Sequence, residues 1–413
     1  MQKYFIKTLL LPKFSVLTAG FLISAIYYTL TAILPIYFIE SLSNGGLEWS
    51  KEQTFSVVGT YIAVAGTAPF FGGLFADFCI GRKRMTCIGF FLALSGVIGF
   101  LTTPFIVTSL LSVALGAGFA KVGLISSVAS LSGEERQKNY DNYYLAIATG
   151  YVTGNLIANP LFDWFGIEGL AVFVFCGFIV SGLLGVRFCS NAFIEKSEKG
   201  ENAGNLPLFA IFSLLAVSFF LVSHQSQTSI CLFVHQEADR TIGSFTVPTL
   251  WFIALGTLSA IVAVPFRRRV WENINATVRY PELLQVMVGF LFSAFSFACL
   301  GALAFWGQQL RTFHVSVLFA VNALFFIADL HVRPVLFAAA TRYVPARFHT
   351  FSSAFVYVCI GVGAKLAGGI AGFVNSIGFS SLFYLCSFVC LASSLAGFVC
   401  WQSFTRQDRV VRG

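Results

Sequence analysis

The feature that most constrains this chain is a series of twelve apolar runs separated by short polar turns. Each run is about 20 residues long, the length with which an α-helix crosses the hydrocarbon core of a bilayer. The sequence is only 11% charged, whereas a soluble protein carries roughly 25% charged residues. Too few charges remain to cover a surface that faces water. The sequence therefore predicts an all-α polytopic membrane protein, with transmembrane helices over residues 14–38, 54–76, 85–104, 108–131, 142–163, 167–187, 207–233, 247–266, 283–306, 313–342, 350–373 and 378–402.

The basic residues are spread unevenly over the turns between these runs. With the N-terminus placed inside, 20 of the 26 lysines and arginines fall in inner turns and termini, and only Lys51, Arg240 and Arg311 fall outside. Because cytoplasmic loops carry such an excess, both termini are predicted to lie in the cytoplasm, with the protein in the plasma (inner) membrane. The net charge of +8 follows from this topology, so nucleic acid is not expected as a partner.

The polar stretch between the sixth and seventh runs divides the chain into two parts with six runs each. We expect an N-terminal six-helix bundle over 1–189, a cytoplasmic linker over 190–206 and a C-terminal six-helix bundle over 207–413. Many membrane transporters are built from two parallel halves of this kind. The first run is too long for a signal-peptide core and is expected to remain as a span.

The sequence does not favour an enzyme. The 10 cysteines lie in or beside apolar runs and form no cluster with histidine, so we expect small buried side chains and neither a metal nor a cofactor. No nucleophile elbow or phosphate-binding loop is present in the sequence.

The second apolar run ends in a glycine pair that is followed by an aspartate and three cations. Glycines at a helix end let a neighbouring helix approach closely. Asp77 lies where an apolar helix excludes charge, so it needs a partner such as a helix N-terminus or a guanidinium. This loop resembles the signature loop between helices 2 and 3 of the major facilitator superfamily, and the interval from Asp77 to the next glycine is that of its proton-dependent oligopeptide transporter family. The resemblance implies an inner gate that locks one access state, formed by Gly73, Asp77, Gly81 and Arg82.

Other segments resemble the same family, in the same order along the chain. They are Tyr27-Tyr28 before Ala32-Ile33-Leu34, the glycine-rich turn before Lys121, Tyr143-Tyr144 before Gly150, Ser223-His224-Gln225 in place of Tyr-Glu-Gln, Ala328-Asp329-Leu330 in place of Gly-Glu-Leu, and Arg333-Pro334 in place of Ser-Pro. The resemblance covers nearly the whole chain. It implies the major facilitator fold and a small peptide or amino-acid-like solute moved by proton-coupled alternating access.

The chain also departs from the family pattern. The first span of the family carries an acid-x-x-acid-arginine cluster tied to proton coupling, and the corresponding positions here are Gly20, Ile23 and Ser24. The glutamate of span 7 is His224, and that of span 10 is shortened to Asp329. These departures leave open a uniporter or exporter of another small solute, such as a nucleotide precursor, nitrate or a drug, without the usual proton coupling. A third hypothesis, a membrane sensor or scaffold, is disfavoured by the short termini.

Two ionisable residues inside spans are the main candidates for a substrate site, because such groups cost on the order of 3 kcal/mol each at the bilayer centre. Lys121 is expected to line a central cavity and bind a substrate carboxylate; the alternative is that it snorkels or pairs with Asp329. Asp329 is expected to neutralise a substrate amine or to carry the coupled proton. The alternative is a structural pair with Arg333, one helical turn later.

Four further residues complete the predicted site. His224 and Gln225 lie in a polar run that indicates a wet cavity, and His224 is a second proton-coupling candidate because histidine titrates between pH 5 and 8. The alternative is a neutral, hydrogen-bonding histidine. Tyr27 and Tyr28 offer hydroxyls to a substrate, with packing as their alternative. The protein is expected to act as a monomer, with a small-molecule substrate, protons and the lipid bilayer as its partners.

Overall fold

The computed structural model describes residues 12–101, 105–129, 136–188, 205–226, 229–242, 244–247, 249–310, 313–345, 348–371 and 374–412. Most of the predicted linker, residues 190–204, therefore lies outside the described residues, as do residues 1–11 at the N-terminus.

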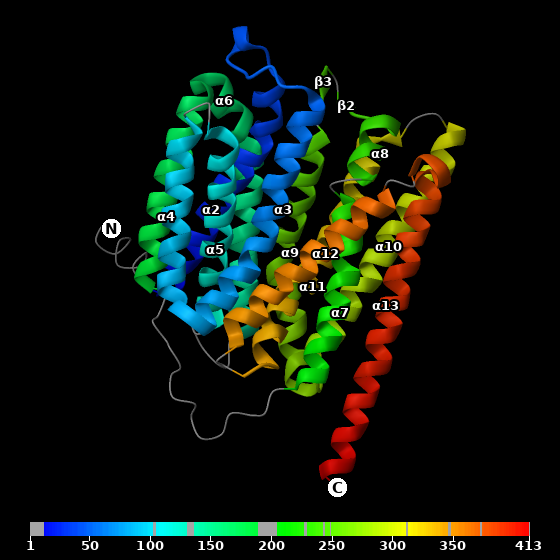
Figure 1. Ribbon diagram of the computed structural model, residues 1–413. Helices are drawn as coiled ribbons and strands as arrows, with labels where there is room; N and C mark the ends of the chain where they lie inside the picture. Colours follow the sequence, from blue (N-terminus) through cyan, green and yellow to red (C-terminus); the bar gives the residue numbers. More distant parts are fainter. Residues whose placement is uncertain are drawn as a thin grey trace, which may run out of the picture. The chain divides into compact units, whose positions relative to one another are not determined.

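The described chain is built almost entirely of helices (Figure 1). In chain order these are α2 (Pro12–Ile39), η1 (Leu42–Asn44), α3 (Lys51–Phe75), the π-helical turn η2 (Ala76–Ile80), α4 (Arg82–Phe100), α5 (Ile106–Ala129), α6 (Arg136–Phe188), α7 (Leu206–Ser223), η4 (His224–Ser226), α8 (Ser229–Glu237), α9 (Thr249–Thr277), α10 (Pro281–Leu310), α11 (Val315–Arg342), α12 (His349–Ala371) and α13 (Val374–Arg412). The strands are two residues long: β1 (Ala238–Asp239), β2 (Thr241–Ile242), β3 (Phe245–Thr246) and β4 (Phe313–His314).

Each predicted span is helical over most of its described residues, which confirms the polytopic all-α class. α6 holds two spans, because its 53 residues form two helices joined at Gly166, where φ is 64°. α13 bends in the same way at Gly378, where φ is 77°. Glycine occupies this region of φ without a steric penalty, so it is the natural residue at both joints. Among the described residues, ten helical segments are long and apolar enough to cross a bilayer.

Local sequence explains where several helices begin. Ser50 precedes α3, and its side chain accepts a hydrogen bond of 3.1 Å from the amide of Gln53. Asn205 does the same for α7, accepting from the amide of Leu208 at 3.1 Å. These side chains satisfy backbone N–H groups that have no partner inside the first turn of a helix.

The chain forms two compact units, and the first comprises residues 1–204 together with 344–358. Within it α2 lies along α6, and α5 packs between α3 and α4. Gly150 and Gly154 make the α2–α6 contact possible, since a Cβ atom at either position would lie 2.4 Å from a backbone oxygen of α2. Two small residues one turn apart allow two helix backbones to approach this closely.

The second unit comprises residues 205–343 and 359–413. Within it α10 packs against both α11 and α13, and α11 packs against α9. β1 pairs in parallel with β4, and β2 pairs with β3 as a small antiparallel hairpin. This unit differs from the predicted C-terminal bundle, residues 207–413, by the start of α12, which binds to residues of the first unit as described below.

The start of α10 and the end of α11 are joined by a polar contact. Glu282 at the start of α10 accepts hydrogen bonds from Arg342 and, at 3.0 Å, from the hydroxyl of Tyr343. Burial, with a further contribution from the Glu282 carboxylate, raises the pKa of the Tyr343 phenol well above its ordinary value. Tyr343 therefore remains a hydrogen-bond donor to Glu282 at any physiological pH.

Candidate functional site

The turn between α3 and α4 binds the first turn of α12. The carboxylate of Asp77 accepts a hydrogen bond of 2.6 Å from the backbone amide of Phe351. Arg82 lies 3.7 Å from the same carboxylate and donates to the hydroxyl of Thr350 at 2.5 Å. The side chain of Asp77 is only 3% exposed. Both kinds of partner expected for Asp77, a helix N-terminus and a guanidinium, are thereby confirmed.

The two glycines predicted at this gate have separate geometric roles. Gly73 lies against α12, because a Cβ atom at this position would be 2.5 Å from the Cβ of Ala354 and 3.0 Å from the carbonyl of Thr350. Gly81 precedes α4 with φ 85°, in the region that glycine adopts most easily. The close approach of a neighbouring helix is confirmed at Gly73, while the gating role of Gly73 and Gly81 stays a prediction.

Lys121 on α5 lies over a tyrosine of α2. Its ammonium nitrogen is 3.9 Å from the centroid of the Tyr27 ring. Tyr27 meets Tyr28 edge to face at 5.1 Å and stacks on Tyr61 of α3 at 5.7 Å, and Tyr28 meets Tyr151 of α6 at 4.4 Å. We call these four tyrosines the tyrosine cluster. Attraction between the ammonium and the ring face compensates the cost of a cation inside a span.

Tyr61 is a candidate that the sequence analysis missed. Its side chain is fully buried, and its hydroxyl interacts with the side chain of Thr31 on α2. Tyr61 thereby belongs to the same buried group as Tyr27, on which its ring stacks. The sequence signal is weak, because Tyr61 is a single tyrosine in a run of small and apolar residues.

Asp329 and Arg333 on α11 form a forked ion pair. The Nε of Arg333 donates to the two carboxylate oxygens of Asp329 at 3.0 and 3.2 Å, and its Nη2 donates at 3.0 Å. The side chain of Asp329 is 5% exposed and that of Arg333 is 32% exposed. The guanidinium also lies 5.0 Å from the ring centroid of Phe220 on α7. The i,i+4 pair, which the sequence offered as the alternative for Asp329, is present.

His224 completes this group of residues, which we call the α7–α11 cluster: Phe220, His224, Asp329 and Arg333. Its Nδ1 lies 2.7 Å from the carbonyl oxygen of Phe220. Because a carbonyl only accepts, Nδ1 carries a proton and donates. His224 also interacts electrostatically with Arg333 and Asp329. The two proton-coupling candidates, His224 and Asp329, thus lie in one cluster of the second unit.

Gln225 braces the break between α7 and α8. It is fully buried, its Nε2 donates to the carbonyl of Ala367 on α12 at 3.2 Å, and its Oε1 accepts from Ser229 at 2.6 Å. The break interrupts the helical hydrogen bonds, and buried polar side chains supply replacements. The contact of Gln225 with a substrate stays a prediction. The pair of Lys121 with Asp329 also stays a prediction, because these two residues belong to different units.

The positions of the missing acidic cluster are filled by packing. A Cβ atom on Gly20 would lie 2.7 Å from the ring of Tyr143 on α6. Ile23 is buried, and the hydroxyl of Ser24 donates to the carbonyl of Ile147 at 2.9 Å. This part of α2 is occupied by its contact with α6, and longer charged side chains do not fit there without rearrangement.

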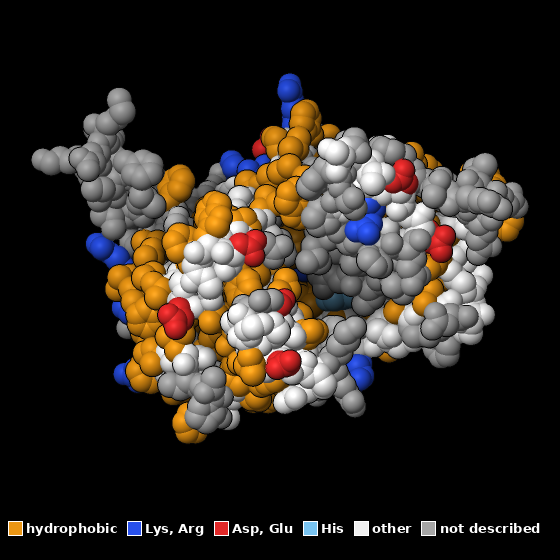
Figure 2. All heavy atoms as spheres, turned by 90° about the horizontal axis from the view of Figure 1, so that it is seen from above, with side chains coloured by type: hydrophobic (Ala, Val, Ile, Leu, Met, Phe, Trp, Pro, Cys, Tyr) orange, Lys and Arg blue, Asp and Glu red, His pale blue; other side chains and the backbone are white. Residues whose placement is uncertain are grey.

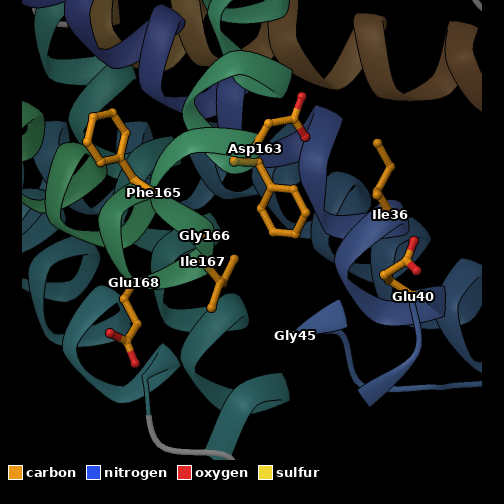
Figure 3. A pocket seen from close by; sticks show the side chains of 9 residues that line it. Ile36, Glu40, Gly45, Asp163, Phe165, Gly166, Ile167 and Glu168 are labelled. Carbon is orange, nitrogen blue, oxygen red and sulfur yellow. The ribbon is translucent and has the colours of Figure 1, made fainter. Parts of the chain in front are cut away.

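A pocket of about 840 Å³ lies in the first unit where α2 ends and α6 bends. Figure 3 shows its three carboxylates, from Glu40, Asp163 and Glu168, pointing in different directions. Figure 2, which views the molecule from the top of Figure 1, shows acidic side chains scattered among hydrophobic ones at this end. Among the described residues, no group of three or more His, Cys, Asp or Glu side chains is placed to hold a metal ion. None of the predicted site residues lines this pocket.

The relatives found by comparison with known proteins include peptide transporters. A sequence model described as the POT family matches residues 178–386. The chain is 22% identical over 434 residues to the peptide transporter YePEPT of Yersinia enterocolitica subsp. palearctica serotype O:3 (strain YE-P4), covering 85% of each protein. It is 21% identical over 317 residues to dipeptide and tripeptide permease B of Yersinia enterocolitica serotype O:8 / biotype 1B (strain NCTC 13174 / 8081), covering 61% of this chain and 63% of that protein.

Solved structures share the fold over nearly the whole length of the chain. A crystal structure of a POT family transporter in complex with a thioalcohol-conjugated peptide superposes with a TM-score of 0.74 at 14% identity, covering 94% of this chain and 95% of that one. A crystal structure of the peptide transporter POT in complex with sulfate gives a TM-score of 0.71 at 16% identity, covering 96% and 95%. The predicted architecture, the major facilitator fold with two six-helix halves, is confirmed.

Proposed function

The chain belongs to the POT family, and we propose that it carries small peptides or amino-acid-like solutes across the plasma membrane together with protons. Family membership and the shared fold support a secondary transporter that works by alternating access. The relatives with the names peptide transporter and dipeptide and tripeptide permease support a peptide as the solute.

The observation that carries the proton-coupled part of this proposal is the ion pair within α11. A carboxylate inside a span is costly and commonly marks a proton or substrate pathway. The carboxylate of Asp329 accepts hydrogen bonds from the guanidinium of Arg333, and it also interacts electrostatically with His224. Because the acids of the first span are absent, we assign the coupled proton to this cluster, with Asp329 as its first candidate and His224 as the second.

The remaining site residues are proposed in the roles expected from the sequence. Lys121, held over Tyr27, offers a cation to a substrate carboxylate, and Tyr28 offers its hydroxyl. Gln225 shapes the site at the break between α7 and α8. The turn that binds α12, formed by Gly73, Asp77, Gly81 and Arg82, serves as the inner gate. We further propose a monomer in the plasma (inner) membrane with both termini in the cytoplasm and no nucleic-acid partner.

Uptake by the purified protein tests this proposal. The protein would be reconstituted in liposomes, and radiolabelled dialanine would be supplied outside under an inward proton gradient. We expect accumulation that a protonophore abolishes, and losses of at least about tenfold in Lys121→Ala and Asp329→Ala, since a tenfold loss corresponds to only about 1.4 kcal/mol of binding. If liposomes that contain the wild-type protein took up neither dipeptides nor tripeptides, this result would contradict the proposed function. Unchanged uptake by both Lys121→Ala and Asp329→Ala would contradict the proposed site.

A second candidate function, a uniporter or exporter of another small solute, is favoured by one observation. Gly20, Ile23 and Ser24 replace the coupling acids and are engaged in packing against α6. Solute movement that is insensitive to both pH and membrane potential would select this function over proton-driven uptake.

A further inference from the structure

We infer that the inner end of α9 binds an anionic phospholipid, with Arg269 at the phosphate of its headgroup and with Phe266 and Val270 along its acyl chains. The lipid is a partner beyond the proposed function, because α9 carries none of the predicted site residues. Only the choice of the cytoplasmic leaflet rests on the proposed orientation of the chain.

The first argument is an apolar stripe that runs the length of α9. Its members are spaced three or four residues apart, so they share one face of the helix, and each is at least 36% exposed. We call them the α9 stripe: Trp251, Leu255, Leu258, Val262, Phe266 and Val270. α9 packs on α11 through another face, on which Trp271 is buried beside His331. The α9 stripe is therefore left to the acyl chains of the bilayer.

The second argument is the depth at which the α9 stripe ends. α9 continues past the predicted span, 247–266, to Thr277. The headgroup region extends roughly 5–8 Å beyond each side of the hydrocarbon core. Along the helix axis, Arg269 lies about 5 Å and Val270 about 6 Å beyond Phe266. Phe266 is thus placed at the edge of the core, and Arg269 is placed at the level of the phosphates.

The third argument is that the three consecutive arginines of α9 point in different directions. Arg267 is 4% exposed and donates to Gln285 of α10 at 3.0 Å. Arg268 is half-buried and has contacts of its own within the protein. Arg269 is exposed and lies next to Val270, at the edge of the α9 stripe. Its guanidinium is therefore the one that a ligand in the bilayer can reach.

The chemistry of this position fits an anionic lipid better than a soluble anion. A guanidinium donates paired N–H groups to the oxygens of a phosphate, and the apolar stem of Arg269 lies along the α9 stripe. The nearby acid Glu272 is exposed on the side of Arg269 away from the stripe, so its repulsion favours a phosphate on the stripe side. A free phosphate would meet one exposed cation, whereas a lipid also covers Phe266 and Val270.

The test measures which lipid lies next to α9. A bimane fluorophore would be attached to Val262→Cys, a member of the α9 stripe, in a background whose other cysteines are alanine. The protein would be reconstituted with phosphatidylcholine and phosphatidylglycerol, one of which carries brominated chains that quench bimane on contact. The matched control probe is Leu214→Cys, which is 71% exposed on α7, a helix without lysine or arginine.

Three substitutions at exposed cations separate a site from diffuse attraction. Arg269→Gln removes the proposed phosphate ligand, and Arg269→Lys keeps its charge. Arg84→Gln removes another exposed cation, at the start of α4. Glycerol phosphate, a headgroup without chains, serves as a soluble competitor. Thermal unfolding shows that each variant is folded. Native mass spectrometry of bound phosphatidylglycerol repeats the comparison of wild type and Arg269→Gln with the natural cysteines in place.

We expect phosphatidylglycerol to be preferred about fivefold at the Val262 probe, the factor that one cation near an anionic lipid surface provides. Arg269→Gln should lower this preference to about one. Arg269→Lys should retain most of the preference, and Arg84→Gln should leave it unchanged. The Leu214 probe should show no preference for either lipid. Glycerol phosphate should leave the quenching as it is.

Several outcomes would overturn the inference. An unchanged preference in Arg269→Gln would show that this residue does not bind the headgroup, and an equal loss in Arg84→Gln would indicate attraction by the overall charge. Displacement of the lipid by glycerol phosphate would assign the site to a soluble anion. None of these measurements depends on transport, so a protein that takes up no peptide would contradict the proposed function and leave the lipid site standing.

Discussion

Gly20 illustrates how local packing excludes the acidic side chain that the family carries at the corresponding position. The sequence shows that an acid is missing there, and the structure shows that the ring of Tyr143 takes the space of any side chain. The loss of the acidic cluster is therefore built into the α2–α6 contact. Restoring an acid at this position requires that contact to move.

Adding a methyl group at position 20 should consequently destabilise the protein. We expect Gly20→Ala to cost about 1–3 kcal/mol, because its Cβ would lie 2.7 Å from a buried ring. Gly66→Ala on α3 is the matched control, since a Cβ there meets nothing within 4 Å; alanine should stabilise that helix by about 0.5–1 kcal/mol. Thermal unfolding in detergent measures both. Equal midpoints for the two variants would refute the steric account.

The accommodation of Lys121 depends on the face of the Tyr27 ring more than on its hydroxyl. Tyr27→Phe keeps the ring and should remain near wild-type stability. Tyr27→Leu removes both the cation–π contact at 3.9 Å and the stacking on Tyr61, a loss of on the order of 2 kcal/mol. Thermal midpoints of the two variants decide the matter. A Phe variant as unstable as the Leu variant would show that the hydroxyl, and not the ring face, is what matters.

At the scale of elements, the sequence predicts helices well and their interruptions less well. Each predicted span is helical over most of its described residues, because length and hydropathy are local properties. Span 7 was expected as one helix over 207–233, yet it breaks into α7, η4 and α8. Its polar residues predict a wet cavity, and one of them, Gln225, is fully buried and donates a hydrogen bond to a carbonyl of α12 at the break. That contact joins residues 142 positions apart, which periodicity cannot reveal.

The start of α12 should be the element most sensitive to Asp77. Asp77→Ala leaves the amide of Phe351 without its 2.6 Å acceptor, and a hydrogen bond to a charged group contributes about 1.5–3 kcal/mol. Hydrogen exchange at the first turn of α12 should therefore accelerate by about tenfold or more.

Asp163→Ala serves as the control for this experiment, because Asp163 is an exposed acid at the bend of α6. It should leave exchange in α12 unchanged. If Asp77→Ala also left it unchanged, the carboxylate would not hold this helix end.

At the scale of the whole molecule, the candidate site is only partly predictable, because the partners of several site residues lie far away in the sequence. The Asp329–Arg333 pair lies within one helical turn, so the i,i+4 rule identified it. The acceptor role of Asp77 was foreseen as a type of contact, but its partner lies 274 residues away and could not be named. Tyr61 was missed because its significance comes from Tyr27 on another helix.

The topology predicted from the charge distribution can be tested across the whole molecule with two cysteines. Cys79 is exposed and lies in η2, the same turn as Asp77, on the predicted inner side. Glu168 is exposed at the acidic pocket beside the bend of α6, on the predicted outer side. Two proteins would be made in a background whose other cysteines are alanine, one that keeps only Cys79 and one that carries only Glu168→Cys.

An excess of cations on one side fixes the orientation of the whole chain, so the two positions must respond oppositely. A membrane-impermeant maleimide added to intact cells should label the Glu168→Cys protein and leave Cys79 unmodified. In inverted vesicles the pattern should be reversed, and detergent-solubilised protein should be labelled at both positions, which controls for reactivity. Labelling of Cys79 from outside would place the cation-rich turns on the outer face, and the inner gate proposed at Asp77 and Arg82 would then have to be assigned to the opposite side of the membrane.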